Sequence, residues 1–154
     1  MVEAGKGKDS FWAPYIKLLP RTFDILPLWS PEELEELQED SDVIKEVLDH
    51  QQKTKLFFHE KFLPLLNQYQ LDGSKLTFET YVWAAAAAAT RCFYINGSLD
   101  YAMVPMADLL NHHPESPTTW KIKDDFIVVV ARGGGFERGT QIYNNYGFKR
   151  RYVS

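Results

Sequence analysis

The sequence predicts an α+β protein, with helices in its first half and short strands joined by loops in its second half. Between Asp42 and Tyr69, apolar residues recur at the three- and four-residue spacing of a helix. After residue 100 the pattern changes to short runs rich in Val, Ile and aromatic residues, such as the run at 125–132, which are typical of strands. Because the helices precede the strands instead of alternating with them, a wound parallel sheet is not expected.

The N-terminal region is expected to hold a tail, a proline-rich stretch and the start of a helix. Residues 1–10 are polar and predict a flexible tail. Three prolines within residues 11–29 exclude one long helix there. Ser30 is followed by Pro31 and then by Glu33, three residues after the serine. This order predicts a helix that begins with a capping box.

Two longer helices are expected next. The first follows Asp42, and Pro64 is expected to kink or end it. A turn is predicted at residues 72–74, where the sequence reads Asp-Gly-Ser. Thr77 is expected to cap the second helix, which runs through an alanine-rich stretch to about Phe93. Alanines favour a helix and carry little bulk, so this helix is expected to lie close against a neighbour.

The second half is expected to form extended segments, at residues 100–110, 125–132 and 139–147. The last two segments flank Gly133–Gly135, for which a flexible hairpin turn is predicted. The triple glycine lacks the Lys-Ser/Thr pair that a phosphate-binding loop needs, so a nucleotide phosphate site is not expected there.

The composition limits the class of protein and its partners. The 154 residues, 45% hydrophobic and 25% charged, fit one globular domain or half of a larger one. The net charge of -4 gives no general attraction to nucleic acid or anionic lipid, and neither is expected as a partner. The apolar run at 81–95 is shorter than the roughly 20 residues of a membrane span. The single cysteine, Cys92, excludes an internal disulfide and favours an intracellular location, in the cytoplasm or nucleus.

The histidines do not have the spacing of a metal site. His59 and Glu60 lack the second His of the helical zinc-protease motif. His112 and His113 are adjacent and would point in different directions, and there is no pair of cysteines. No metal site is therefore expected.

Two polar segments remain as candidate sites, one at Asn111-His112 and one at Tyr146-Gly147. Each has a structural explanation when taken alone. Asn111 could cap a turn, His112 could be a hydrogen-bonded core imidazole, and Tyr146 could end a strand. The order and spacing of the two segments together favour a functional interpretation.

Together these segments resemble the two C-terminal motifs of the SET-domain protein methyltransferases. The similar branch is typified by the RuBisCO large-subunit lysine methyltransferase and the actin-histidine methyltransferase. Its motif Pro-x-x-Asp-x-x-Asn-His is matched by Pro105, Asp108, Asn111 and His112. Its strand ending in Asn-Tyr-Gly is matched by Asn145, Tyr146 and Gly147. Its helix ending in Ser-Arg-x-Phe is matched at Arg91 and Phe93, with Thr90 in place of the serine.

The resemblance implies a β-rich SET core with a helical insert. By this resemblance residues 11–76 are the insert, and residues 77–154 are the C-terminal half of the core. The implied cofactor is S-adenosylmethionine, held by Arg91, Asn111 and His112. Tyr146 is implied as the catalytic tyrosine, with Asp108 and Phe93 on the substrate side. The implied reaction transfers a methyl group to a lysine side chain of a protein substrate, and a histidine side chain is the alternative acceptor.

The sequence also departs from the family pattern. Nothing before Phe11 resembles the strands that carry the family's Gly-x-Gly segment, and the residues after Gly147 differ from those that usually follow in the family. The chain is therefore expected to lack the N-terminal SET strands and the C-terminal substrate-binding domain. The alternative function is a truncated, non-catalytic SET-derived module that binds other proteins. A plastid location would require an upstream transit segment, and the oligomeric state is left open.

Overall fold

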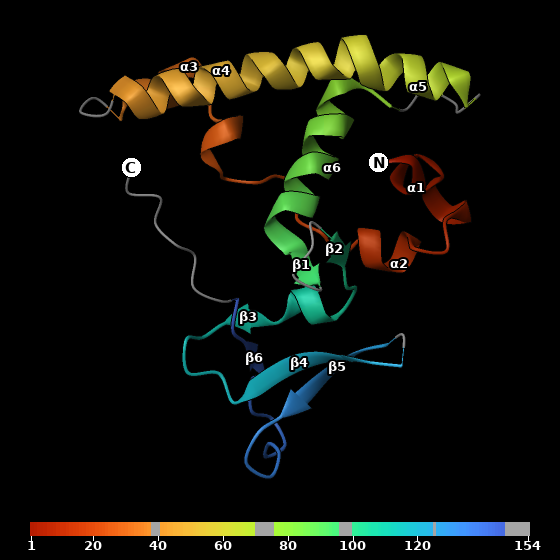
Figure 1. The fold of residues 1–154 in the computed structure, drawn as a ribbon, viewed down its shortest axis with the longest axis vertical. Coiled ribbons are helices and arrows are strands. Elements are labelled where there is room, and N and C mark those ends of the chain that lie inside the picture. The colour runs from red at the N-terminus through yellow and green to blue at the C-terminus, as the bar shows by residue number, and fades with distance from the viewer. Residues whose placement is uncertain (38–40, 70–75, 96–99, 125, 147–154) are drawn as a thin grey trace. The chain divides into compact units, whose positions relative to one another are not determined.

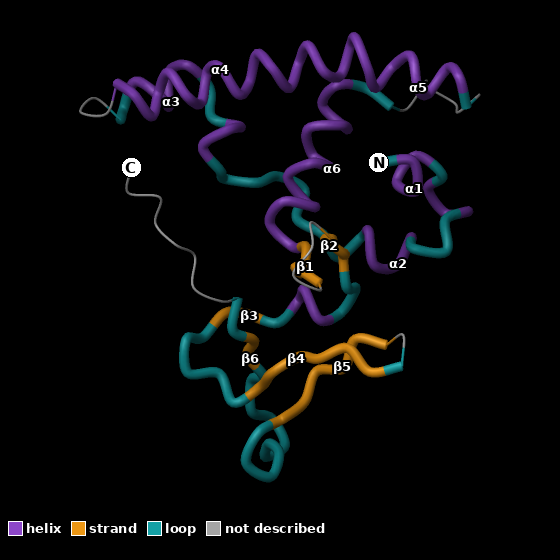
Figure 2. The backbone as a smooth tube through the Cα atoms, in the orientation of Figure 1, coloured by secondary structure: helices purple, strands orange, loops and turns teal. Residues whose placement is uncertain are grey.

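The chain forms two compact units, Met1–Thr90 (unit 1) and Arg91–Ser154 (unit 2). The computed structural model describes residues 1–37, 41–69, 76–95, 100–124 and 126–146 (Figure 1). Helices make up most of unit 1, whereas the strands belong to unit 2 (Figure 2). The predicted α+β class is confirmed. This division falls after Thr90, and the insert at residues 11–76 and the half-core at residues 77–154 stay predictions from the resemblance.

The first ten residues are folded, whereas the sequence predicts a flexible tail. They form the short helix α1 (Val2–Gly5) and the 3-10 helix η1 (Gly7–Asp9). The Ser10 side chain is buried, and its hydroxyl donates a hydrogen bond to the Glu3 carboxylate at 2.7 Å. Glu3 also pairs with Lys6. These polar residues therefore bind one another, a pairing that their polarity alone did not predict.

The capping box predicted at Ser30 is confirmed. The preceding elements are short, α2 (Ala13–Ile16) and the 3-10 helix η2 (Leu26–Leu28). Helix α3 (Pro31–Glu35) then begins with the Glu33 N–H donating to the Ser30 hydroxyl, while the Ser30 N–H donates to the Glu33 carboxylate. Two backbone donors at the start of the helix are thereby satisfied.

The long helix predicted after Asp42 is present, and its geometry changes just before Pro64. Helix α4 (Ser41–Phe57) continues into the π-helix η3 (Phe58–Phe62) and then into α5 (Leu63–Gln68), as one rod (Figure 1). Proline has no N–H to bond to the preceding turn, and its ring crowds that turn. The wider π turn is the local adjustment that lets the helix pass through the proline instead of ending there.

Helix α6 (Phe78–Arg91) completes unit 1 and begins as predicted. The Thr80 N–H donates to the Thr77 hydroxyl at 3.3 Å. The helix ends at Arg91 instead of about Phe93, because Cys92 already belongs to a strand. The turn predicted at 72–74 lies outside the described residues. The buried apolar residues of unit 1 are Leu19, Leu34, Val47, Phe58, Leu66, Leu76, Ala86 and Ala87.

The described part of unit 2 contains three two-stranded sheets. Strands β1 (Cys92–Ile95) and β2 (Asp100–Met103) pair antiparallel. Strands β4 (Thr118–Lys123) and β5 (Phe126–Ala131) also pair antiparallel, with Lys123 opposite Phe126. Strands β3 (Asn111–His112) and β6 (Tyr143–Asn144) form a short parallel pair. This last pair brings Asn111 and His112 beside the strand that ends two residues before Tyr146.

The strand pairing corrects the predicted hairpin. Gly133–Gly135 follows β5 with φ values of 74°, 100° and 108°, but β5 pairs with β4 and not with β6. The hairpin turn instead lies between Lys123 and Phe126, where Asp124 has φ 46°. A short polar side chain tolerates this left-handed conformation better than most. No helix in the described ranges is long and apolar enough to cross a membrane.

Candidate functional site

The predicted cofactor and catalytic residues lie in unit 2, on or beside the segment that leads into β3. Met106 turns the chain with φ 76°, which is the left-handed region that a residue with a side chain rarely adopts. The 3-10 helix η5 (Ala107–Leu109) follows, and Leu110 is extended. The strained turn at Met106 therefore sets the direction in which the Asn111-His112 strand leaves η5.

Arg91 and Asp108 meet at the start of this segment. The Asp108 carboxylate has no exposed surface, and its Oδ2 lies 3.6 Å from Nη1 of Arg91. The same Nη1 donates a hydrogen bond to the Asp108 carbonyl at 3.0 Å. Arg91 therefore holds both the side chain and the backbone of Asp108. A carboxylate enclosed in this way positions the segment, and the place of Asp108 on the substrate side stays a prediction.

Tyr146 meets the same segment at its other end. Its hydroxyl donates to the Leu110 carbonyl at 2.6 Å, and its N–H donates to Nδ1 of His112 at 3.1 Å. The two rings lie 5.1 Å apart. Because Nδ1 of His112 accepts a hydrogen bond, the neutral ring carries its proton on Nε2. One directional hydrogen bond thus joins Tyr146 to His112, 34 positions before it, and a second joins Tyr146 to Leu110.

The surface around this pair is open to a ligand. Asn111, His112 and Tyr146 are all exposed, and Tyr146 keeps 50% of its surface. Asn111 lies opposite Tyr143 in the parallel pair. Within the described ranges, the Asn111 side chain makes no hydrogen bond to the protein. An amide donor and acceptor, an imidazole N–H and a phenol are therefore available together on one short sheet.

Phe93 is placed differently from the other predicted residues. It lies in β1 opposite Ala102, and its ring packs edge-on against Trp120 with centroids 5.8 Å apart. The described contacts thus unite Arg91 with Asp108 and His112 with Tyr146, and place Phe93 in an aromatic pair.

Comparison with known proteins identifies relatives of the chain. The chain is 33% identical over 149 residues to the actin-histidine N-methyltransferase of Xenopus tropicalis, which covers 90% of the chain. It is 28% identical over 155 residues, or 96% of the chain, to the ribosomal lysine N-methyltransferase set10 of Schizosaccharomyces pombe. The structure of Rubisco LSMT bound to AdoMet matches 96% of the chain with a TM-score of 0.68 and 25% identity. The chain is a homologue of the SET-domain protein methyltransferases.

This SET homologue spans only part of its relatives. It covers 25% of the length of the Xenopus enzyme, 27% of the yeast enzyme and 34% of the Rubisco LSMT chain. No family model matches the chain. The family and the branch indicated by the Asn-His and Asn-Tyr-Gly motifs are nevertheless confirmed by these relatives.

Two hydroxyl residues of the SET homologue were not anticipated from its sequence. Ser116 and Thr118 are buried, and each hydroxyl donates to the Tyr143 carbonyl at 2.6 Å. The His113 N–H donates to the Asn144 carbonyl at 3.0 Å. These bonds fix β6, which carries Tyr146 two residues after its end. The local sequence places hydroxyl residues on either side of Pro117, a pattern that also fits an ordinary exposed turn.

A pocket lies beside the same strand. Its volume is about 490 Å³, and its lining includes Trp120, Arg132, Asn144 and Asn145. Among the described residues no group of three or more His, Cys, Asp or Glu side chains could hold a metal ion.

Proposed function

We propose that the SET homologue is part of an S-adenosylmethionine-dependent protein methyltransferase that methylates a lysine side chain. The observation that carries the proposal is the position of the Tyr146 phenol, 2.6 Å from the Leu110 carbonyl and against the His112 ring. This arrangement joins Tyr146 of one motif to His112 of the other by a hydrogen bond, just beyond the parallel pair of β3 and β6. The relatives named for methylating lysine or histidine in proteins support the same class of reaction.

The residues present suit an S-adenosylmethionine site. Asn111 is exposed and offers an amide that can both donate and accept, and His112 is exposed and offers an Nε2 proton. Arg91 holds the segment that carries both residues, through the Asp108 carbonyl. When bound, the cofactor supplies an electrophilic methyl group on a sulfonium sulfur, and the protein supplies alignment and electrostatics.

Tyr146 is proposed to orient the lysine amine. Its hydroxyl proton is donated to the Leu110 carbonyl, which leaves oxygen lone pairs to accept an N–H of the amine. An amine held in this way presents its own lone pair to the methyl carbon. Correct alignment of two reacting groups contributes roughly 7–11 kcal/mol to such a step.

The charge around Tyr146 also suits a neutral amine. An ordinary lysine with a pKa of about 10.4 costs about 4.6 kcal/mol to deprotonate at pH 7. A free carboxylate beside the amine would raise that cost by stabilising the ammonium form. Asp108, the nearby carboxylate of the segment, is enclosed and paired with Arg91. A phenol orients the amine without adding a negative charge.

Acceptor and location complete the proposal. Lysine is the proposed acceptor, and histidine is the alternative that an assay must include, because the relatives are named for both. The proposed location is intracellular, in the cytoplasm or nucleus. A protein is the proposed substrate class, since the relatives are named for modifying proteins.

Substitution of Tyr146 tests the proposal. Tyr146→Phe should lower methyl transfer from labelled S-adenosylmethionine by about 100-fold or more, because the group that orients the amine is lost. The affinity for S-adenosylhomocysteine, measured by calorimetry, should change less than about twofold, whereas Asn111→Ala should weaken it at least about tenfold. The matched control is Tyr143→Phe, which removes a hydroxyl that donates to Gln141 instead.

Two results would contradict this proposal. Unchanged turnover in Tyr146→Phe would remove the proposed role of the phenol. Absence of S-adenosylhomocysteine binding up to millimolar concentration would support the alternative of a non-catalytic protein-binding module.

A further inference from the structure

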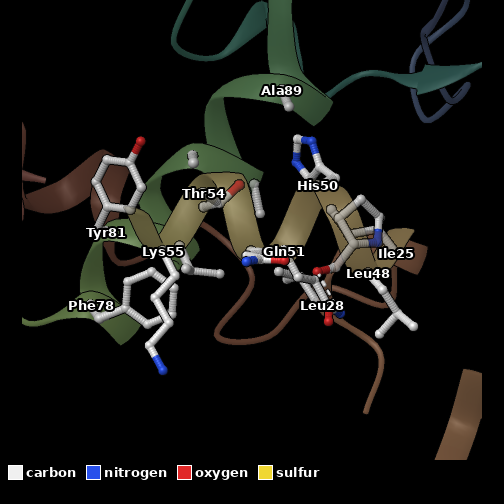
Figure 3. A pocket seen from close by; sticks show the side chains of 15 residues that line it. Ile25, Leu28, Leu48, His50, Gln51, Thr54, Lys55, Phe78, Tyr81 and Ala89 are labelled. Carbon is white, nitrogen blue, oxygen red and sulfur yellow. Dashed lines mark hydrogen bonds between the residues drawn. The ribbon is translucent and has the colours of Figure 1, made fainter. Parts of the chain in front are cut away.

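A groove in unit 1 has no role in the proposed methyl transfer. It lies between α4 and α6, and its third wall is the segment around η2, which contributes Ile25, Pro27 and Leu28 (Figure 3). Its volume is about 770 Å³, and most of its lining side chains are apolar. All of its lining residues belong to unit 1, so it is described within a single unit.

Half of the residues that α6 contributes to the groove are alanines. The α6 residues in the lining are Phe78, Tyr81, Val82, Ala85, Ala86 and Ala89, which recur at helical spacing along one face. Ala85 and Ala89 are exposed. The stripe from Phe78 to Ala89 is roughly 16 Å long at 1.5 Å per residue, which matches three turns of a helix laid against it.

The third wall is fixed to the two helices by hydrogen bonds. Gln51 of α4 donates through Nε2 to the carbonyls of Pro27, at 3.2 Å, and Trp29, at 2.9 Å. Trp83 of α6 donates through Nε1 to the Pro20 carbonyl at 2.8 Å. The segment is thereby held at both ends, so the groove is formed before any ligand binds.

The charge of the groove is opposite to that of the chain. Its lining includes Lys55 and His50 but no Asp or Glu, although the chain has a net charge of -4. The other two lysines of α4, Lys45 and Lys53, pair with Asp42 and Asp49. Lys55 has no such carboxylate among the described residues and extends past Phe78 at the rim (Figure 3). The rim therefore offers an unneutralised ammonium group beside an apolar trough.

We propose that this groove binds an amphipathic helix of a partner protein. The apolar face of that helix would lie against the alanine stripe of α6, and a carboxylate on its flank would pair with Lys55. Helix-in-groove recognition uses apolar anchors at this spacing, and complementary charge at the rim adds specificity. The proposal does not depend on the methyl transfer proposed for unit 2.

Two synthetic peptides test the groove directly. Both are 16-residue amphipathic helices with leucine on one face; one carries glutamate beside the leucines, and the other carries lysine at the same positions. Fluorescence anisotropy should show the glutamate peptide binding at least about tenfold tighter, which corresponds to about 1.4 kcal/mol. Lys55→Glu should remove this preference, and raised salt should weaken it.

Matched variants separate the groove from the rest of the surface. Lys53→Glu makes the same charge change on α4 outside the groove, and should leave both affinities within about twofold. Ala89→Trp should fill the trough and weaken both peptides at least about tenfold. Thermal unfolding of each variant shows whether it is folded, and Ala89 is exposed, so the fold should tolerate the change. Tyr146→Phe should leave peptide binding unchanged.

Three outcomes would overturn the proposal. Equal affinity for the two peptides would remove the role of Lys55. Unaltered binding in a folded Ala89→Trp variant would place the peptide elsewhere. Self-association in sedimentation experiments that Ala89→Trp abolishes would identify the groove as a contact between two copies of the chain.

Discussion

The two units bury different kinds of side chain. The buried residues in the described part of unit 1 are eight apolar side chains and Ser10, whereas those in the described part of unit 2 are all polar. The buried residues of unit 2 are Asp108, Ser116, Thr118 and Asn144. Unit 1 is therefore stabilised mainly by apolar surface removed from water. The described part of unit 2 depends more on hydrogen bonds that satisfy its buried polar groups.

Several hydrogen bonds of unit 2 join distant residues. Four backbone carbonyls, those of Asp108, Leu110, Pro114 and Tyr143, each accept from a side chain that lies at least 17 positions away. Such a bond contributes only about 1 kcal/mol net, but it depends strongly on distance and angle. Apolar packing suits the scaffold of unit 1, whereas directional bonds suit a region in which a phenol must be placed accurately.

The largest effect is expected from truncating the centre of unit 1. Phe58 is 3% exposed and contacts the rings of Phe62, Phe78 and Tyr81. Phe58→Ala should lower the free energy of unfolding by about 3–5 kcal/mol, because it removes a large buried side chain and leaves a cavity. Chemical denaturation followed by circular dichroism measures this loss.

Phe11→Ala is the matched control, because Phe11 is 82% exposed and undergoes the same chemical change. The control should change stability by less than about 0.5 kcal/mol. Similar losses in the two variants would contradict the view that unit 1 depends on its buried aromatic cluster.

A smaller and different effect is expected in unit 2. Thr118→Val keeps the shape of a buried side chain but removes one of the two hydroxyls that donate to the Tyr143 carbonyl. The expected loss of stability is about 1–2 kcal/mol, with changed amide chemical shifts in β6. Thr119→Val is the matched control on the same strand, where the structure records no side-chain bond to Tyr143. Equal shifts in β6 from both variants would argue against a specific role for the Thr118 hydroxyl.

Features fixed by neighbouring residues could be predicted from the sequence. The capping box at Ser30 and the cap at Thr77 each need only a side chain and the N–H groups of the next turn. Pro64 changes the helix through its own ring and missing N–H. The Asn-His and Asn-Tyr-Gly motifs indicated the family, because ordered motifs are recognisable without knowledge of their contacts.

Features fixed by distant residues could not be predicted in the same way. The hairpin was assigned to Gly133–Gly135 because glycine favours turns, but β5 pairs with β4, which the sequence analysis did not identify as a strand. The tail prediction overlooked the bond between Ser10 and Glu3. Nothing local to Thr118 indicates that it bonds to Tyr143, 25 positions later. Pairing across such distances depends on the whole fold.

The smallest effect is expected at the start of α6, where the stabilisation is polar but exposed. The Thr77 hydroxyl, followed by the Glu79 backbone N–H, lowers the pKa of the Glu79 carboxyl below its ordinary value of 4.5. A lowered carboxyl pKa means that the ionised form stabilises the fold above the ordinary pKa, and that this contribution is lost as the pH falls through the lowered value. Carbon-detected NMR titration should therefore show Thr77→Ala raising the pKa of Glu79, while Thr77→Ser keeps it low.

A variant of Glu79 compares the exposed cap of α6 with the apolar interior of unit 1. Glu79→Gln should make the stability of α6 slightly less sensitive to acid below pH 4.5. This effect should be smaller than the loss of stability that Thr118→Val causes at neutral pH, because water screens an exposed carboxylate. Part of the acid response should remain, since the backbone N–H of Glu32 and the Ser30 hydroxyl also lower the pKa of Glu32. If Glu79→Gln instead destabilised unit 1 as much as Phe58→Ala, exposed polar caps would matter as much as buried rings there. The difference in stabilisation between the two units would then not be explained by the kind of side chain that each unit buries.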